Sequence, residues 1–262
     1  MAEDKFITDQ GAIDHIWEKE WQGGNPSDLG VIFQHRLFLE GYPIFARYIP
    51  KDAKRILDVG AGTGRYGLKF AQDYPKSHVT ITDVLPESLM HIEAYRHELN
   101  VSNVSIQKES ALQLSFHNET FDVVFCDVVI QHLPDYRQAF SEMSRVLAPG
   151  GTLIVSTNNV WNIPHTAYKL AHRVLGRTYR YGLERSFTRG ELAALANEKA
   201  LDVVALDGFY FAYGVYRWKE YFTIFKFVGG VLNRISQFLD KLTSRGFSRY
   251  FGFEIFVVAR KK

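Results

Sequence analysis

The hydrophobic positions of this chain follow two alternating patterns between residues 55 and 160. Short apolar runs, typical of buried strands, are separated by segments in which apolar residues recur every three or four positions, as in amphipathic helices. Strands and helices that alternate at this spacing predict a doubly wound, mainly parallel sheet with right-handed crossovers. Such a sheet binds its ligands at the carboxyl ends of the strands. The predicted strands are 56–59, 78–84, 104–107, 121–126 and 152–156, and the predicted helices are 66–74, 86–99 and 136–147.

The segments on either side of this core are mainly helical in pattern. A helix over 31–48, kinked at Pro43, follows a polar arm over 1–20 that is either mobile or a short helix. A long apolar-rich helix is predicted for 216–242, broken or bent at Gly229-Gly230. The remaining predicted elements are a helix at 192–200, which a capping box at Thr188 and Glu191 begins, and strands at 201–206 and 253–259.

Composition and charge restrict the class of protein. The chain has 262 residues, 46% of them hydrophobic, which suits one large domain with a sizeable core. Its net charge is only +2, so DNA is not an indicated partner. The single cysteine, Cys126, excludes an intramolecular disulfide and a cysteine zinc cluster. No apolar signal peptide or spanning segment is visible, so we expect a cytoplasmic protein.

The stretch 55–65, RILDVGAGTGR, carries the clearest sign of a ligand site, because a predicted strand runs directly into three alternating glycines. Glycine lets the backbone approach a ligand closely, and the N–H groups of the following helix face that ligand. Two ligand classes compete. Residues 62–67 match the dinucleotide pattern G-x-G-x-x-G, which alone is a weak signal. Asp58, two residues before the first glycine, and the spacing G-x-G-x-G favour a small zwitterion instead.

Further motifs follow in order: TDV at 82–84, FDVV at 121–124 and RVLAPGGTL at 145–153. Together with ILDVGAGTG at 56–64, they make the chain resemble the class I S-adenosylmethionine-dependent methyltransferases. The resemblance implies a seven-stranded Rossmann-like α/β sheet with an antiparallel last strand, and S-adenosyl-L-methionine as the cofactor. We expect one methyltransferase domain over 1–262, with an N-terminal helical cap (1–50), a cofactor-binding core (51–160) and acceptor-side insertions (160–187 and 209–245).

The resemblance also implies roles for individual residues. The loop glycines would let the backbone meet the methionine half of the cofactor. Asp83 would accept both ribose hydroxyls and Leu85 would cover one adenine face, while Ser110 stands where the family often has an acid. The implied cofactor residues are Asp58, Gly60, Ala61, Gly62, Gly64, Asp83, Val84, Leu85, Ser110, Ala111, Cys126 and Asp127, with Arg36 as a partner for the cofactor carboxylate.

Several of these residues have a purely structural alternative. Asp58 would then only orient the glycine loop through backbone hydrogen bonds, and Asp83 would be a solvated strand end. Cys126 would be a small buried residue, and Arg36 would lie on a solvated helix face.

His132 is the candidate catalytic residue. Methyl transfer from a sulfonium mainly requires positioning, but a hydroxyl acceptor also benefits from a base. His132 lies near the carboxyl end of the fourth strand and titrates near neutral pH; a histidine that only packs a helix is the alternative. The segment resembles the O-methyltransferases of quinone biosynthesis, whose Glu-x-x-Glu-His motif supplies metal-binding groups. Val128 and Gln131 occupy the two acidic positions here, so no metal site is predicted.

The acceptor side carries no motif. Basic and aromatic residues interleave in 160–187, which suits an anionic, aromatic or lipid-like small molecule, or RNA. A helix over 167–174 with a solvated basic face is the alternative. The stripe over 216–242 would pack on its own domain, cap the site, form a homodimer or contact a membrane surface. The candidate acceptor residues are Trp161, His165, Tyr181 and Arg185.

The sequence therefore predicts an S-adenosylmethionine-dependent methyltransferase of a small molecule, with oxygen as the favoured acceptor atom, acting as a monomer or homodimer. An RNA or protein methyltransferase is the alternative within the same reaction class. An NAD(P)-dependent oxidoreductase and a non-enzymatic cofactor-binding module are the alternatives from other classes.

Overall fold

A seven-stranded sheet forms the centre of the computed structural model, which describes residues 9–23, 29–176, 182–244 and 246–262. The strand order is β3-β2-β1-β4-β5-β7-β6; β7 runs antiparallel to both β5 and β6, and the other neighbours are parallel. The predicted fold class is thereby confirmed. The strands are β1 (Arg55–Val59), β2 (His78–Asp83), β3 (Val104–Lys108), β4 (Phe121–Cys126), β5 (Leu147–Asn158), β6 (Asp202–Phe209) and β7 (Glu254–Arg260).

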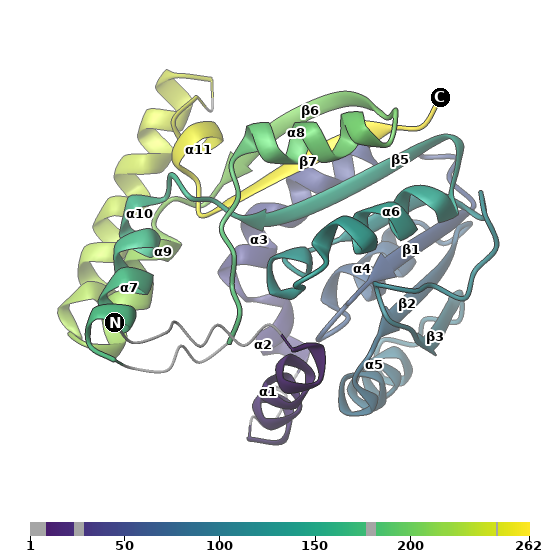
Figure 1. The fold of residues 1–262 in the computed structure, drawn as a ribbon, viewed down its shortest axis with the longest axis horizontal. Coiled ribbons are helices and arrows are strands. Elements are labelled where there is room, and N and C mark those ends of the chain that lie inside the picture. Colours follow the sequence, from purple (N-terminus) through teal and green to yellow (C-terminus); the bar gives the residue numbers. More distant parts are fainter. Residues whose placement is uncertain (1–8, 24–28, 177–181, 245) are drawn as a thin grey trace.

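Helices cover both faces of the sheet, because strand residues alternate between two hydrophobic clusters (Figure 1). Ile56 and Phe125 pack with α3, α4 and α5 on one face, whereas Leu57 and Cys126 pack with α6 and α8 on the other. The helices are α1 (Gln10–Gly23), α2 (Leu29–Phe33), α3 (Arg36–Phe45), α4 (Arg65–Asp73), α5 (Pro86–Glu98), α6 (Tyr136–Val146), α7 (Ile163–Val174), α8 (Arg189–Glu198), α9 (Tyr213–Tyr216), α10 (Ile224–Leu242) and α11 (Gly246–Phe251), with 3-10 turns η1 (Ala46–Tyr48), η2 (Ile130–His132) and η3 (Arg217–Glu220).

The structure differs from the prediction in one helix before the core and in one strand of the sheet. The helix predicted for 31–48 breaks at His35, whose backbone is extended with φ −62° and ψ 127°, while Pro43 lies inside α3. The fifth strand begins at Leu147 rather than at residue 152, because Leu147 already pairs with Phe121 of β4. Local proline and glycine signals were therefore outweighed by pairing and packing with distant residues.

The long helix predicted for 216–242 is also divided differently. It breaks between η3 and α10, whereas Gly229 lies within α10 and is buried. A Cβ atom on Gly229 would lie 2.6 Å from Cε1 of Tyr216, so this glycine serves a close contact between helices rather than a bend.

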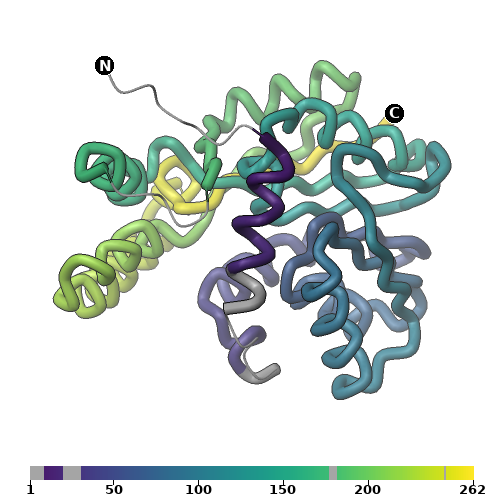
Figure 2. Tube along the Cα trace, turned by 60° about the horizontal axis from the view of Figure 1, so that its bottom comes forward, coloured from purple at the N-terminus to yellow at the C-terminus, as the bar shows by residue number. Residues whose placement is uncertain are grey.

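Two groups of helices flank the sheet outside the core layers. At the carboxyl ends of β5 and β6, α7, α9, α10 and α11 form a helical lobe at the left of Figure 1. At the other end of the chain, the polar arm is the helix α1, which lies in front of the molecule in Figure 2, between the sheet and this lobe. Within the described residues, no helix has the length and apolar character needed to cross a membrane.

Candidate functional site

The glycine loop between β1 and α4 forms one wall of a cavity at the carboxyl ends of β1, β2 and β4. Gly60 and Gly64 have φ angles of 66° and 71°, a region that favours glycine. A Cβ atom would lie 2.6 Å from Val129 at Gly60 and 2.8 Å from Ile92 at Gly64. Backbone conformation and space therefore both require glycine at these two positions, and the loop backbone at Gly60 lines the cavity.

Asp83, the last residue of β2, fixes the loop from the neighbouring strand. Its Oδ2 accepts a hydrogen bond from the N–H of Gly62 at 2.8 Å, and its Oδ1 accepts one from the N–H of Leu85 at 3.0 Å. Each carboxylate oxygen has a further lone pair, so the group can still accept hydroxyl donors from a ligand. Burial raises the pKa of Asp83, and the two backbone N–H groups oppose that shift.

Asp58 lies in β1 beneath the loop and also lines the cavity. Its Oδ2 accepts a hydrogen bond from the N–H of Gly67 in the first turn of α4, at 2.9 Å. Burial raises the pKa of Asp58 to about 8; the hydrogen bond from Gly67 opposes this, and repulsion from Asp127 and Asp83 adds to it. Asp58 thus both orients the loop and presents a carboxyl group to the cavity.

Asp127 follows β4 and is the third buried carboxyl group of the site. Its Oδ1 accepts a hydrogen bond from the hydroxyl of Ser156 at 2.6 Å, and its Oδ2 lies 3.7 Å from Nη2 of Arg65. Burial raises the pKa of Asp127, while Arg65 opposes that shift. Behind it, the fully buried Glu254 has its pKa held well above the usual range by burial and by the charge of Asp127.

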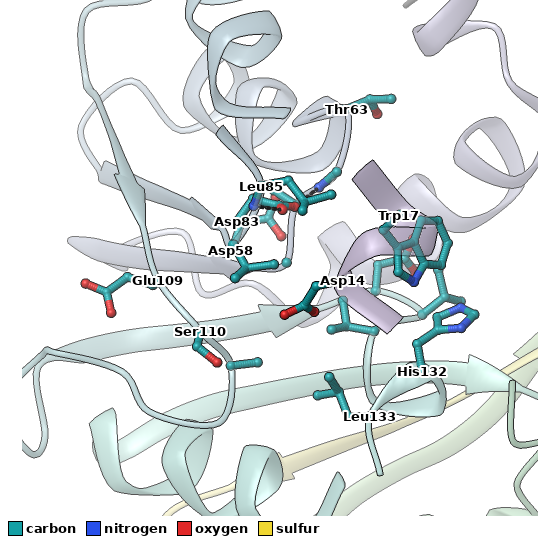
Figure 3. A pocket seen from close by; sticks show the side chains of 18 of the residues that line it. Asp14, Trp17, Asp58, Thr63, Asp83, Leu85, Glu109, Ser110, His132 and Leu133 are labelled. Atoms are coloured by element: carbon teal, nitrogen blue, oxygen red, sulfur yellow. Dashed lines mark hydrogen bonds between the residues drawn. The ribbon is translucent and has the colours of Figure 1, made fainter. Parts of the chain in front are cut away.

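The cavity has a volume of about 300 Å³ and brings together residues from five parts of the chain. Figure 3 shows carboxyl groups and apolar side chains facing each other across it. The lining consists of Gln10, Ile13, Asp14, Trp17, Asp58, Gly60, Ala61, Gly62, Thr63, Arg65, Tyr66, Asp83, Val84, Leu85, Glu109, Ser110, Ala111, Asp127, Val128, Val129, His132 and Leu133.

Helix α1 supplies the wall that sequence reasoning missed. Ile13, Asp14 and Trp17 of α1 all line the cavity, and Figure 3 shows the side chains of Asp14 and Trp17 beside it. The ring centroid of Trp17 lies 4.8 Å from that of His132, in an edge-to-face arrangement. The sequence signal for this helix was the apolar pair Ile13 and Trp17, which are four residues apart. It was not recognised because the surrounding segment is otherwise polar.

His132 lies at the cavity with both ring nitrogens engaged. Its Nδ1 donates to the carbonyl oxygen of Leu183 at 2.7 Å, and its Nε2 lies 3.1 Å from Nε2 of Gln131. The Gln131 Oε1 atom accepts from the N–H of Asn158 at 2.7 Å, so its Nε2 is the donor toward His132. Burial lowers the pKa of His132, which leaves a neutral imidazole at neutral pH.

Three predicted cofactor residues lie outside the lining. Cys126 is completely buried in the hydrophobic cluster of β4 and α6, and burial raises the pKa of its thiol. Gly64 is the N-cap of α4 and faces Ile92 instead of the cavity. The structure places Arg36 in a groove between α3 and α10, where its Nη1 donates to the hydroxyl of Tyr216 at 2.7 Å.

The predicted acceptor residues do not line the cavity either. His165 is buried, and its Nε2 lies 2.8 Å from Oε1 of Glu184. Arg185 pairs with Glu191 at 2.7 Å, and Trp161 is more than half exposed. Tyr181 lies outside the described residues. Because Glu184 engages His165, the interleaved charges of this segment stabilise its own fold.

The charge of the lining indicates what kind of ligand fits. Among the described lining residues, carboxyl groups outnumber the single guanidinium of Arg65. Burial raises the pKa of Asp58, Asp83 and Asp127, so a cationic ligand would stabilise the charged forms of these carboxyl groups. S-adenosylmethionine, which carries a sulfonium and an ammonium group, fits this requirement. No group of three or more histidine, cysteine or acidic side chains suited to a metal ion occurs in the described part of the chain.

Comparisons with known proteins agree with this site. A family model described as a methyltransferase domain matches residues 56–151, which include the glycine loop, Asp83 and His132. Demethylmenaquinone methyltransferase from Deinococcus radiodurans is 31% identical over 112 residues, 42% of this chain and 45% of that protein. An O-methyltransferase from Pyrenophora dematioidea is 30% identical over 132 residues, 50% of this chain and 48% of that protein. The chain thus spans about half the length of these relatives.

A solved structure extends the similarity of the fold to almost the whole chain. Phosphoethanolamine N-methyltransferase 2 from Haemonchus contortus, in complex with S-adenosyl-L-methionine, matches with a TM-score of 0.60 over 95% of this chain and 57% of that one. The sequences are 19% identical in that alignment, so the match concerns the fold.

Proposed function

We propose that this chain, which belongs to the class I S-adenosylmethionine-dependent methyltransferases, transfers a methyl group to a hydroxyl group of a small molecule. The names of its relatives, a demethylmenaquinone methyltransferase and an O-methyltransferase, support a small-molecule acceptor. The family match to the glycine-loop region removes the support for a nicotinamide-dependent oxidoreductase.

The cofactor would lie along the loop and the ends of β1 and β2. The backbone at Gly60 and Gly62 would contact its methionine half, and Asp83 would accept the ribose hydroxyls while Leu85 covers the adenine. Asp58 and Asp127 would stabilise its positive charges. When bound, the cofactor supplies an electrophilic methyl group, and the protein's part is to hold the acceptor oxygen in line with it.

The observation that carries the small-molecule proposal is the position of α1. Ile13, Asp14 and Trp17 close the side of the cavity opposite the glycine loop. The resulting space of about 300 Å³ lies at the lower end of the volumes typical of sites for small ligands, which favours a small acceptor over a nucleic acid or a folded peptide segment.

We further propose that His132 removes the proton from the acceptor hydroxyl. Its neutral imidazole carries an acceptor lone pair on Nε2, which the amide of Gln131 shares at 3.1 Å. An acceptor hydroxyl would therefore donate to Nε2 in competition with Gln131. Asp14, whose carboxylate points into the cavity in Figure 3, is the second group in reach of an acceptor.

Transfer of a labelled methyl group tests this function. The purified protein is incubated with labelled S-adenosylmethionine and, in parallel, with a panel of phenols and hydroxylated metabolites, total RNA and a protein lysate. Label in a low-molecular-weight hydroxyl compound is expected. Label only in RNA or protein would assign the alternative acceptor class. In parallel calorimetry, binding of NADH but not of S-adenosylhomocysteine would contradict the methyltransferase function itself.

A further inference from the structure

Helix α10 turns its large apolar side chains away from the protein. These side chains recur every three or four residues along the whole helix, so they form one continuous stripe. Each of them has 40–71% of its surface exposed. We call this surface the α10 stripe; it consists of Phe222, just before the helix, and Ile224, Phe227, Val231, Ile235, Phe238 and Leu242.

The inner face of the same helix is built mainly from small or half-buried residues. Gly229 and Ser236 are its buried positions, and Gly229 lies against the ring of Tyr216. An ordinary surface helix places its largest apolar residues inward. In α10, Phe225, Leu232 and Leu239 are half-buried, and a second set of large apolar residues faces outward, so the chain's own packing does not explain the stripe. A contiguous exposed apolar surface of this kind marks an interaction site.

Basic side chains lie along one edge of the stripe. Lys226, Arg234 and Lys241 are exposed on α10, and Arg36 faces the first two across the groove between α3 and α10. The acidic side chains nearby already have partners within the chain. Glu40 accepts from Nε2 of Gln237 at 3.0 Å, and Asp240 accepts from the N–H of Ser248 at 2.7 Å as well as from its hydroxyl.

This charge pattern distinguishes between two possible occupants. In an antiparallel twofold pairing of α10 with a second copy, the basic edge would face the same basic edge, with like-charge repulsion. An anionic lipid surface offers the opposite arrangement, with hydrocarbon for the stripe and phosphates for the basic edge. Three of the seven stripe residues are phenylalanines, which suit insertion at the boundary between headgroups and acyl chains.

We propose that the α10 stripe docks this protein on an anionic lipid bilayer, with α10 lying in the plane of the membrane surface. The phenylalanines insert among the acyl chains, and Lys226, Arg234 and Lys241 contact lipid phosphates. Helix α7, in the same lobe (Figures 1 and 2), also exposes the apolar side chains of Leu170 and Val174. The proposal does not depend on which acceptor is methylated.

Vesicle co-sedimentation tests the proposal on the full chain. Wild-type protein is expected to bind phosphatidylcholine vesicles that contain about 30% phosphatidylglycerol, and to bind them more weakly as salt is raised. Phe227→Ser with Phe238→Ser should weaken binding about tenfold or more. Lys226→Gln and Arg234→Gln should each weaken it about fivefold. Unchanged affinity for S-adenosylhomocysteine verifies that each variant is folded.

Matched variants on other surfaces provide the controls. Met90→Ser on α5 removes an equally exposed apolar side chain, and Lys51→Gln removes an exposed lysine; both should bind vesicles as wild type does. Absence of wild-type binding to anionic vesicles would overturn the proposal, as would unchanged binding by the double phenylalanine variant. A dimer in sedimentation analysis that this double variant abolishes, without any vesicle binding, would assign the stripe to a second copy instead.

Discussion

The side-chain amide of Gln131 donates a hydrogen bond to Nε2 of His132 over 3.1 Å. The orientation of this amide is fixed, because its Oε1 already accepts from the hydroxyl of Thr157 and the N–H of Asn158. His132 is thereby held as the tautomer with its proton on Nδ1, toward Leu183. The single lone pair of the imidazole, on Nε2, accepts the hydrogen bond from Gln131.

The proposed role of His132 predicts a specific loss of rate. His132→Ala should lower kcat about a hundredfold or more with little change in cofactor affinity. The pKa of His132 lies below its usual 6.5, so the base is unprotonated at pH 7 and the wild-type rate should fall only below that range. Initial rates across pH, with the acceptor found in the panel, measure both effects.

Asp14→Asn is the control for this prediction. If the acidic fall in rate belongs to His132, Asp14→Asn should leave it in place. A full wild-type rate in His132→Ala would contradict the role, and loss of activity confined to Asp14→Asn would transfer it to that carboxylate.

Asp83→Ala should weaken binding of S-adenosylhomocysteine about 10- to 100-fold. The proposed charged hydrogen bonds to the ribose would be lost, as would the hydrogen bond that the N–H of Gly62 donates to Asp83. Calorimetry measures the change. Glu109→Gln is the matched control, since Glu109 also lines the cavity but accepts from the N–H of Ser115 at 2.9 Å. Equal affinities for the two variants would show that Asp83 has no special contact with the ligand.

Gly64→Ala separates backbone strain from steric conflict. Gly64 has φ 71° and a Cβ would lie 2.8 Å from Ile92, whereas Gly150 has φ 74° and no atom within 4 Å of such a Cβ. Gly150→Ala should cost about 1 kcal/mol of unfolding free energy, the backbone part alone. Gly64→Ala should cost about 2–4 kcal/mol, because Ile92 must also move. Urea unfolding measures both, and equal costs would show that the contact with Ile92 relaxes freely.

The raised pKa of Asp58 predicts that the stability of the folded protein depends on pH. Its pKa is about 8 in the folded chain against 3.8 in the unfolded one, so the folded state holds the extra proton between these values. The unfolding free energy of the ligand-free protein should therefore decrease as pH rises from 4 to 8. Asp58→Asn should flatten this slope and stabilise the protein at pH 8 by about 1–2 kcal/mol.

The same substitution should weaken binding of S-adenosylhomocysteine, since it removes a carboxylate that we propose stabilises the positive charge of the ligand. Thermal unfolding across pH gives the stability part, with the exposed Asp52→Asn as control. A wild-type slope in Asp58→Asn would assign the pH dependence to other groups.

The sequence predicted the parts of the molecule that rest on local chemistry. The strand pattern and the four motifs placed Gly60, Asp58 and Asp83 correctly at the ends of neighbouring strands, because parallel strands bring their carboxyl ends to one edge. The capping box at Thr188 and Glu191 is formed as predicted. These features depend on short spacings and on turn chemistry that each segment carries within itself.

The rest depended on contacts between distant segments. No local pattern shows that Trp17 meets His132, or that Glu184 engages His165, because each pair is set by tertiary packing. The predicted bend at Gly229 failed for the same reason, since only the position of Tyr216 explains that glycine. The exposure of the α10 stripe could not be predicted either. Helical spacing indicates that an apolar stripe exists, but not whether it faces the core or the solvent.

The candidate site of this protein includes α1, which lies well before the matched methyltransferase domain. The methyltransferase-domain match starts at residue 56, yet Ile13, Asp14 and Trp17 form part of the cavity wall. A fragment limited to the matched region would keep the glycine loop and Asp83. It would lack the cavity wall that α1 supplies, so its cofactor site would be open on that side. In the proposed function, acceptor selection would thus depend on a helix that lies more than thirty residues upstream of the matched region.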